Sequence, residues 1–197
     1  MFEINSLNPK RTAIIVVDMQ NAFVADGAPF YSDMGNKILA PLARFLDRCR
    51  QDGFRIVYTE DCKLPGKSNV LQEGLDGIKI HHRVSPKANE FVVRKYTYSG
   101  FFGTSMDIIL RSGGIDTVVI TGVCTDVCCL STARDAFFLG YKVVFLSDLT
   151  GTFAFPDQGC GPGDAQAQHD MALRNVAFST GRVMDSSEFL ALPHVSD

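Results

Sequence analysis

The fold is decided by residues 117–146, which read TVVITGVCTDVCCLSTARDAFFLGYKVVFL. An apolar run of strand length occupies residues 117–121, and residues 122–126 have the composition of a turn. Residues 127–139 have the length and pattern of a helix, which the next glycine closes, and residues 141–146 form a second apolar run. A strand, a helix and another strand in this order predict one unit of a parallel sheet.

The same alternation of strand and helix continues on both sides of this unit. Further apolar runs of strand length lie at residues 13–17, 54–58 and 91–93. Helices are predicted over residues 38–49 and 104–113, and a Gly/Pro-rich loop at 151–163 precedes one more helix. Repeated units of this kind predict an α/β fold with three layers, α/β/α, around a mostly parallel sheet with right-handed crossovers. With no repeat, linker or low-complexity tract in sight, we expect a single domain over residues 1–197.

Composition excludes several classes of partner. The chain has 197 residues, 46% of them hydrophobic, and a formal net charge of -3. Lys and Arg do not gather on one segment, so we expect no nucleic acid and no anionic membrane as a partner. No secretory leader and no membrane-spanning stretch are recognisable, which predicts a cytoplasmic protein. The six cysteines follow no regular spacing, which favours reduced thiols.

Three residues are candidates for chemistry because they follow predicted strands. Asp18 ends the first strand, Lys95 ends the strand that begins at Phe91, and Cys128 lies in the first turn of the helix after residues 117–121. Ligands of an open parallel sheet collect beyond the carboxyl ends of its strands. The helix N-terminus and Lys95 would both favour the thiolate of Cys128, a strong nucleophile toward carbonyl carbon, and Asp18 would shuttle the proton.

Taken residue by residue, other interpretations remain open. A polar residue at a strand end is common, and a cysteine in a helical turn often serves only in packing. Packing is the favoured interpretation for Cys124 and Cys129, and a solvated loop for His81 and His82. A redox or nucleotide-binding α/β module is a rival class, although no G-x-G-x-x-G follows a strand and Cys124 and Cys128 lack C-x-x-C spacing.

Three longer blocks carry a resemblance to a known family. VVDMQNAF at 16–23, RKYTYSGFFGT at 94–104 and TGVCTDVCCLSTARDAFFLGY at 121–141 resemble the motifs of the cysteine-hydrolase (isochorismatase-like) superfamily, in family order and spacing. The resemblance spans roughly residues 11–192 and implies a Rossmann-like hydrolase fold. Three ordered blocks are more specific than any single motif.

The resemblance also implies a role for each candidate. Asp18 would be the proton-transfer group, Lys95 the cation that stabilises the thiolate, and Cys128 the nucleophile of a thioester-type intermediate that water resolves. A cis peptide bond would join Val123 to Cys124, and the backbone amides of Cys124 and Cys128 would form the oxyanion hole. Members with this cysteine cleave amides, so the implied activity is an amidohydrolase.

The substrate is narrowed by two further stretches. YSGFFGTSMDIILRS at 98–112 resembles members that act on ureido compounds, and TFAFPDQGCGPGDAQAQHD at 152–170 resembles the biuret and triuret hydrolases. By this match Gln168 would hydrogen-bond the urea-like end of the substrate, and Phe23 would supply an apolar wall. Residues 59–62, Thr-Glu-Asp-Cys, lack the histidine of the nicotinamidase metal cluster, so we expect no metal and no other cofactor.

The preferred prediction is therefore cleavage of a C–N bond in a small ureido or carbamoyl compound, biuret or triuret. Ureidoacrylate, an N-carbamoyl amino acid or nicotinamide are the alternatives within the family, and a non-catalytic α/β binding module is the alternative outside enzymes. We expect a small amide as the partner, and a homodimer or homotetramer because relatives assemble in this way.

Overall fold

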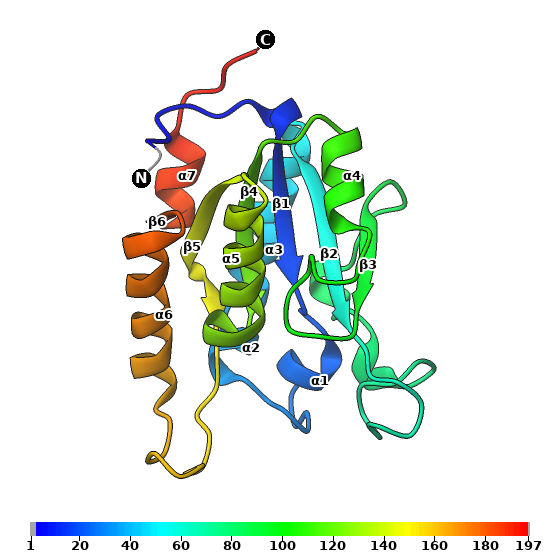
Figure 1. Cartoon of the computed structure of the whole chain (residues 1–197). Coiled ribbons are helices and arrows are strands. Elements are labelled where there is room, and N and C mark those ends of the chain that lie inside the picture. Colours follow the sequence, from blue (N-terminus) through cyan, green and yellow to red (C-terminus); the bar gives the residue numbers. More distant parts are fainter. Residues whose placement is uncertain (1–2, 197) are drawn as a thin grey trace.

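One sheet of six strands organises the computed structural model, which describes residues 3–196 (Figure 1). The strands are β1 (Thr12–Val17), β2 (Arg55–Asp61), β3 (Phe91–Lys95), β4 (Thr117–Val123), β5 (Lys142–Gly151) and β6 (Arg182–Met184). The α-helices are α1 (Asn21–Val24), α2 (Asp33–Lys37), α3 (Leu39–Gln51), α4 (Met106–Ser112), α5 (Leu130–Phe138), α6 (Ala165–Ser179) and α7 (Ser186–Ala191). Single turns of 3-10 helix are η1 (Pro9–Arg11), η2 (Asp76–Ile78) and η3 (His82–Val84), and a π-helix, η4, spans Thr125–Cys129.

The strand order is β3-β2-β1-β4-β5-β6, and every neighbouring pair is parallel. The chain first adds strands on one side of β1 and then crosses to the other side, so the order reverses between β1 and β4. Ligands of such sheets bind beyond the carboxyl ends of the strands at this switch point. The predicted α/β fold with a parallel sheet is confirmed.

Two helical layers cover the faces of the sheet because side chains of a strand point alternately to opposite faces. On β1, Ile14 and Val16 pack with α1, α3 and α7, whereas Ala13, Ile15 and Val17 pack with α4, α5 and α6. All six residues of β1 are buried. A central strand covered on both faces therefore needs the unbroken apolar run that the sequence has here.

Some elements differ from the sequence-based prediction. The helix predicted over 127–139 starts as the π-helix η4, and α5 begins only at Leu130. β6 and α7 were not predicted, because a strand of three residues carries no readable alternation. His81, predicted to lie in a solvated loop, is buried, since its backbone N–H donates to Met19 O at 2.8 Å and draws the loop against the end of β1.

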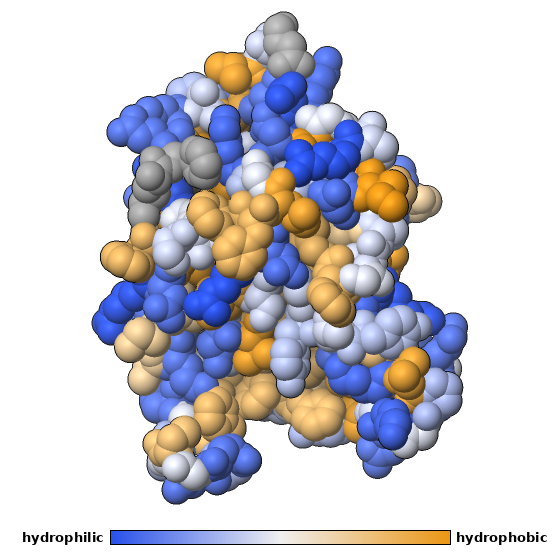
Figure 2. All heavy atoms as spheres, viewed as in Figure 1, coloured by the Kyte–Doolittle hydropathy of each residue, from blue (hydrophilic) through white to orange (hydrophobic). Residues whose placement is uncertain are grey.

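The surface is uneven at the carboxyl edge of the sheet. The strands β1, β2 and β3 run toward the lower edge in Figure 1, and the long connections after β2 and β5 project below it. The face in Figure 2 is mixed, with apolar atoms in several separate patches among hydrophilic ones.

None of the helices formed by residues 3–196 has the length and apolar character needed to cross a membrane.

Candidate active site

The three predicted catalytic residues meet at the carboxyl edge of the sheet. Asp18 directly follows β1, Lys95 is the last residue of β3, and Cys128 lies in η4 after β4. Lys95 Nζ is 2.7 Å from Asp18 Oδ2 and 3.5 Å from Cys128 Sγ. All three are buried, with exposures of 0% for the Lys95 side chain, 1% for that of Asp18 and 7% for Cys128.

A lysine suits its position because of the strand order. β3 is separated from β1 by β2, so about 10 Å of sheet lies between the backbones of Lys95 and Asp18. A long, unbranched side chain spans much of this gap. Its Nζ also donates to Thr97 O at 3.0 Å, so Asp18, Cys128 and Thr97 together offer a partner to each of the three ammonium protons.

Lys95 is a permanent cation in this environment. Burial by itself would lower its pKa, but the surrounding negative charges, with that of Asp18 the largest, outweigh burial and raise the pKa well above the ordinary value. The ammonium group therefore holds a fixed positive charge between a carboxylate and a sulfur.

Asp18 is held by its neighbour on β2. The Thr59 hydroxyl donates to Asp18 Oδ1 at 2.6 Å and accepts from the Asp18 backbone N–H at 3.1 Å. The backbone of Asp18 has φ 48°, in the left-handed region, which is uncommon for a residue other than glycine. Its Oδ2 forms the ion pair with Lys95 and has no hydrogen-bond partner among residues 3–196.

The loop that carries Cys128 has two unusual features. The Val123–Cys124 peptide bond is cis, as the family resemblance implied. The carbonyl of Cys124 accepts from the amides of Val127 and Cys129, at 3.1 and 3.0 Å, and within the described chain it takes no bond from the amide of Cys128 between them. π-turns of this kind often occur at functional sites.

Neighbouring elements fix this loop in place. Thr125 Oγ1 lies 2.9 Å from His169 Nδ1 of α6, and Asp126 Oδ1 accepts from Thr152 Oγ1 at 2.6 Å. On the other side, Thr132 Oγ1 donates to Cys128 O at 2.7 Å and accepts from Gly100 N at 2.9 Å. The loop that carries the nucleophile candidate is therefore held by the segment directly after β5, by α6 and by the loop after Lys95.

Burial has the largest effect on the pKa of Cys128. Burial raises the pKa of Cys128 far above its ordinary value, the charge of Asp18 raises it further, and Lys95 offsets this rise only in part. Lys95 lowers the pKa of Cys128, as expected from the sequence, but burial outweighs its effect. In this environment the neutral thiol is favoured over the thiolate.

The two predicted substrate contacts lie in different surroundings. Phe23 is 9% exposed, packs in the core cluster that contains Cys124, and has its ring centroid 6.0 Å from that of Phe30. Gln168 is half-buried on α6, where its Nε2 donates to Phe153 O at 3.3 Å. It lines a hollow of about 390 Å³ beside Asp126, and none of the three catalytic candidates lines that hollow.

Several buried polar residues at this edge escaped the sequence analysis. Gln20 is 0% exposed, its Nε2 donates to the carbonyls of Asp61 and Ile78, and its Oε1 accepts from Asp61 N at 2.8 Å. Asp61 pairs with Lys63 at 2.7 Å, and burial, opposed by Lys95, raises the pKa of its carboxyl. Gln20 lies inside the block at 16–23 that resembles a family motif, and this resemblance was the sequence signal that could have pointed to it.

No metal-binding group of three or more His, Cys, Asp or Glu side chains occurs among residues 3–196. At the end of β2, the carboxylate of Asp61 forms an ion pair with the ammonium group of Lys63. Cys124 and Cys129 are buried, and burial raises the pKa of each thiol, as expected for cysteines that serve in packing. All six cysteines are free, and Cys160 is exposed.

Comparison with known families gives the ancestry of this arrangement. The isochorismatase domain model matches residues 12–188, which include all three catalytic candidates. The chain belongs to the isochorismatase family. Among solved structures of the family, a cysteine hydrolase from Pseudomonas syringae pv. phaseolicola superposes with a TM-score of 0.89 at 29% identity, over 93% of this chain and 92% of that one.

Relatives that carry enzyme names give the enzyme class. The ureidoacrylate amidohydrolase RutB of Serratia proteamaculans is 32% identical over 92% of this chain and 82% of that protein, and RutB of Agrobacterium fabrum is 33% identical over 74% and 78%. The N-carbamoylsarcosine amidase of Thermoplasma acidophilum superposes with a TM-score of 0.72 at 28% identity, over 89% of this chain and 96% of that one. The predicted class, an amidohydrolase of the isochorismatase family, is confirmed at this level.

Proposed function

We propose that this isochorismatase-family protein hydrolyses a C–N bond of a small ureido compound, with biuret or triuret preferred, and that Cys128 is the nucleophile. The observation that carries the proposal is the buried contact of one ammonium group with both an acid and a thiol, Lys95 Nζ with Asp18 Oδ2 at 2.7 Å and with Cys128 Sγ at 3.5 Å. A nucleophile, a proton acceptor and a fixed cation are the groups that acyl transfer needs.

The first half of the reaction forms a thioester-type intermediate. The carboxylate of Asp18 takes the proton of the Cys128 thiol as the sulfur attacks the ureido carbonyl carbon. The carbonyl oxygen becomes an oxyanion that the backbone amides of Cys124 and Cys128 receive, while Lys95 offsets the negative charge at the sulfur. The tetrahedral adduct then breaks its C–N bond, and Asp18 returns the proton to the departing nitrogen, which leaves as ammonia or an amine.

The second half regenerates the thiol. A water molecule enters, Asp18 takes one of its protons, and the resulting hydroxide attacks the thioester carbon. The C–S bond breaks, the acid product leaves, and the proton held by Asp18 returns to the sulfur of Cys128. Water is the only co-reactant, and no step changes an oxidation state, so the reaction needs no redox group.

An uncharged substrate is favoured by the pairing of the cations at this edge. Lys95 is neutralised by Asp18, and Lys63 by Asp61 at 2.7 Å. A substrate carboxylate buried here would need an additional cation to repay its loss of hydration. Biuret and triuret carry no carboxylate, whereas ureidoacrylate and N-carbamoyl amino acids do.

Substrate orientation would come from two flanking residues. The carboxamide of Gln168 offers both a donor and an acceptor, which matches a neutral ureido group, and Phe23 would close the pocket with an apolar wall. Gln168 lines the hollow beside Asp126, two residues before Cys128, so an extended compound such as triuret would reach it more readily than a short one.

Ureidoacrylate is the second candidate, because the curated relatives at 32 and 33% identity are named for it. An N-carbamoyl amino acid or nicotinamide are weaker alternatives, and a binding module without turnover is the weakest. We also propose a single domain, a cytoplasmic location and assembly as a homodimer or homotetramer. The proposed enzyme uses no metal. The cation that pairs with Asp61 is the ammonium group of Lys63.

A panel of amides tests the proposal. We would measure ammonia release from biuret, triuret, ureidoacrylate, N-carbamoylsarcosine and nicotinamide, with and without iodoacetamide and with a chelator. Cys160→Ser is the matched control, since it removes the exposed thiol and leaves the buried ones. Release from biuret or triuret that iodoacetamide abolishes and the chelator spares is the expected result. Release from ureidoacrylate alone would overturn the substrate, and release from none of the five would overturn the ureido proposal.

A further inference from the structure

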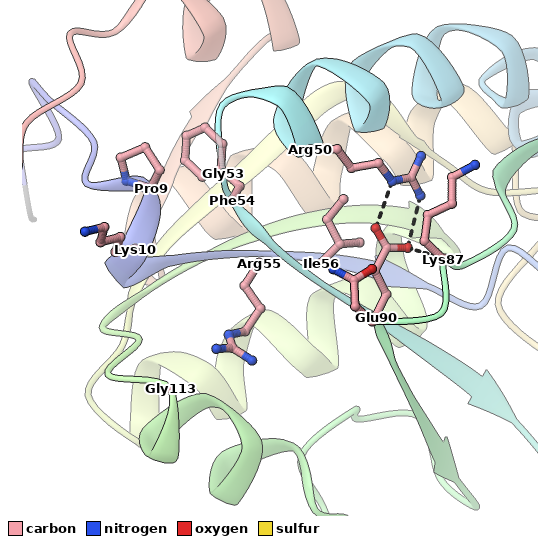
Figure 3. Close-up of a pocket in the computed structure, with 11 residues that line it drawn as sticks. Pro9, Lys10, Arg50, Gly53, Phe54, Arg55, Ile56, Lys87, Glu90 and Gly113 are labelled. Carbon is pink, nitrogen blue, oxygen red and sulfur yellow. Dashed lines mark hydrogen bonds and ion pairs between the residues drawn. The ribbon is translucent and has the colours of Figure 1, made fainter.

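A large hollow lies at the opposite edge of the sheet from Cys128. Its volume is about 710 Å³, and it is lined by the segments that precede β1, β2 and β3 together with Gly113 at the end of α4 (Figure 3). The length of β1, ~20 Å, separates it from Asp18. The hollow therefore takes no part in the chemistry proposed above.

Four of the residues that line this hollow are basic and one is acidic. Lys10, Arg50, Arg55 and Lys87 provide the positive charges, and Glu90 provides the negative one. This balance contrasts with the whole chain, whose formal net charge is -3. Cationic side chains have been concentrated here on a chain that is otherwise acidic.

The acidic residue is already neutralised. Arg50 binds Glu90 through two nitrogens, Nε to Oε1 at 2.8 Å and Nη2 to Oε2 at 3.1 Å, and the backbone N–H of Lys87 donates to Oε2 at 2.7 Å (Figure 3). Arg50 is shared with Asp47 at 2.8 Å and with the Tyr58 hydroxyl at 3.0 Å. Arg50 and Glu90 thus neutralise each other, and the pair contributes little net charge to the hollow.

The other three cations have no acidic partner within residues 3–196: Lys10, Arg55 and Lys87. Arg55 is the informative one. Its Nε is buried without a hydrogen-bond partner, and its guanidinium lies 5.7 Å from the centre of the Phe91 ring. A buried guanidinium nitrogen without a partner is costly.

Gly113 leaves the space that this guanidinium occupies. A side chain at Gly113 would place its Cβ 2.9 Å from Arg55 Nη2, so any larger residue would displace the guanidinium. Lys10 and Lys87 lie on different sides of Arg55 in Figure 3. The positive charge is therefore spread along the hollow and not concentrated at one point.

From this arrangement we infer that the hollow binds a small multivalent oxyanion of the diphosphate type, either free or as part of a nucleotide. A diphosphate distributes its charge over several oxygens, which matches cations spread along one wall, and phosphate oxygens accept well from guanidinium and ammonium groups. A volume of about 710 Å³ accommodates either form.

The alternative explanation is that these cations only compensate the negative ends of helices. α3 and α4 both end at this edge, and basic residues favour helix C-termini. Arg48 and Arg50 serve that role in the last turn of α3, and Arg111 in that of α4. Lys10, Arg55 and Lys87 belong to neither helix, which is why a ligand is the better account of them.

Calorimetric titration of the full chain with pyrophosphate, and separately with ADP, tests this inference at constant ionic strength. The variants are Arg55→Gln and Lys87→Gln, and the matched control is Lys67→Gln, which removes one charge from an exposed loop outside the hollow. We expect saturable binding of at least one probe, about tenfold weaker in each variant and unchanged in the control. If only pyrophosphate binds, the free ion is the ligand; if ADP binds more tightly, the nucleotide is.

Two results would overturn the inference: no saturable binding of either probe to the unaltered chain, or binding that all three substitutions leave equally strong. Should Arg55→Gln fail to fold, the exposed residue Lys87 still carries the test, with Lys10→Gln beside it. Ammonia release from the ureido substrate is expected to be the same in all these variants. A failure of the proposed hydrolase activity would therefore leave this binding test unaffected.

Discussion

The hydroxyl of Thr59 donates a 2.6 Å hydrogen bond to Asp18 Oδ1 and accepts one of 3.1 Å from the Asp18 backbone amide. Both residues are buried, at 0 and 1% exposure; Thr59 lies in β2, and Asp18 directly follows the neighbouring parallel strand β1. This pair of bonds fixes the carboxylate whose other oxygen faces Lys95. Thr59 is therefore a positioning residue for Asp18.

Thr59→Val should lower kcat by roughly 10- to 100-fold, because loss of a buried hydrogen bond misplaces the proton acceptor. KM should change much less, since Thr59 reaches the substrate only through Asp18. Thr59→Ser, which keeps the hydroxyl, should restore most of the rate. Steady-state ammonia release measures both constants, and equal kinetics for the valine and serine variants would refute the positioning role.

Lys95 and Asp18 should be coupled in stability as well as in catalysis. Lys95→Met leaves a buried carboxylate without its cation and is expected to cost about 3–5 kcal/mol of unfolding free energy. Asp18→Asn combined with Lys95→Met should recover a large part of that loss, although both variants should be inactive. Urea unfolding of the unaltered chain, Lys95→Met, Asp18→Asn and the double variant gives the coupling free energy, and strictly additive effects would contradict a buried ion pair.

His169 should make the fold sensitive to acid. Burial lowers its pKa below the ordinary value of about 6.5, so the unfolded chain binds this proton more readily than the folded one. The stabilising contribution is complete above about pH 6.5 and is lost as the pH falls toward the folded-state pKa. His169→Gln should therefore show a shallower decline of unfolding free energy below pH 6.5. An unchanged slope would mean that other groups, such as His81, account for the acid sensitivity.

Alkylation kinetics should report the resting state of Cys128. Because burial and Asp18 raise the pKa of its thiol, inactivation by iodoacetamide without substrate should accelerate with pH, about tenfold per unit between pH 7 and 9. Cys160→Ser should inactivate at the same rate, which assigns the inactivation to a buried thiol. A rate that is already constant below pH 7 would indicate a resting thiolate and contradict this mechanism.

Much of the catalytic edge was predictable from the sequence. The apolar runs before Asp18 and Lys95, and the strand–turn–helix around Cys128, place these residues at strand ends, and a parallel sheet brings strand ends to one edge. Their side chains do meet. The alternation of side chains along β3 was also predictable from the sequence. Lys95 points into the site, whereas the neighbouring Arg94 points away from it and pairs with Glu60, with 3.0 Å between Arg94 Nε and Glu60 Oε2.

The remaining features depend on contacts between distant segments. The hydroxyl of Thr59 and the carboxamide of Gln20 acquire their roles from residues about 40 positions away, which no local pattern reveals. His81 is buried only because a loop returns to the end of β1. The rise in the pKa of Cys128 could not be predicted, because Lys95 and the helix N-terminus can be read from the sequence, whereas the depth of burial cannot.

The most direct test of the central claim is ammonia release from biuret by three proteins: the unaltered chain, Cys128→Ala and Cys129→Ala. Cys129 is the adjacent buried thiol, so its substitution controls for the loss of sulfur at this position of the fold. We predict a fall of at least about 10⁴-fold in Cys128→Ala with the fold retained, and substantial activity in Cys129→Ala. Turnover by Cys128→Ala at the rate of the unaltered chain would contradict the assignment of Cys128 as the nucleophile.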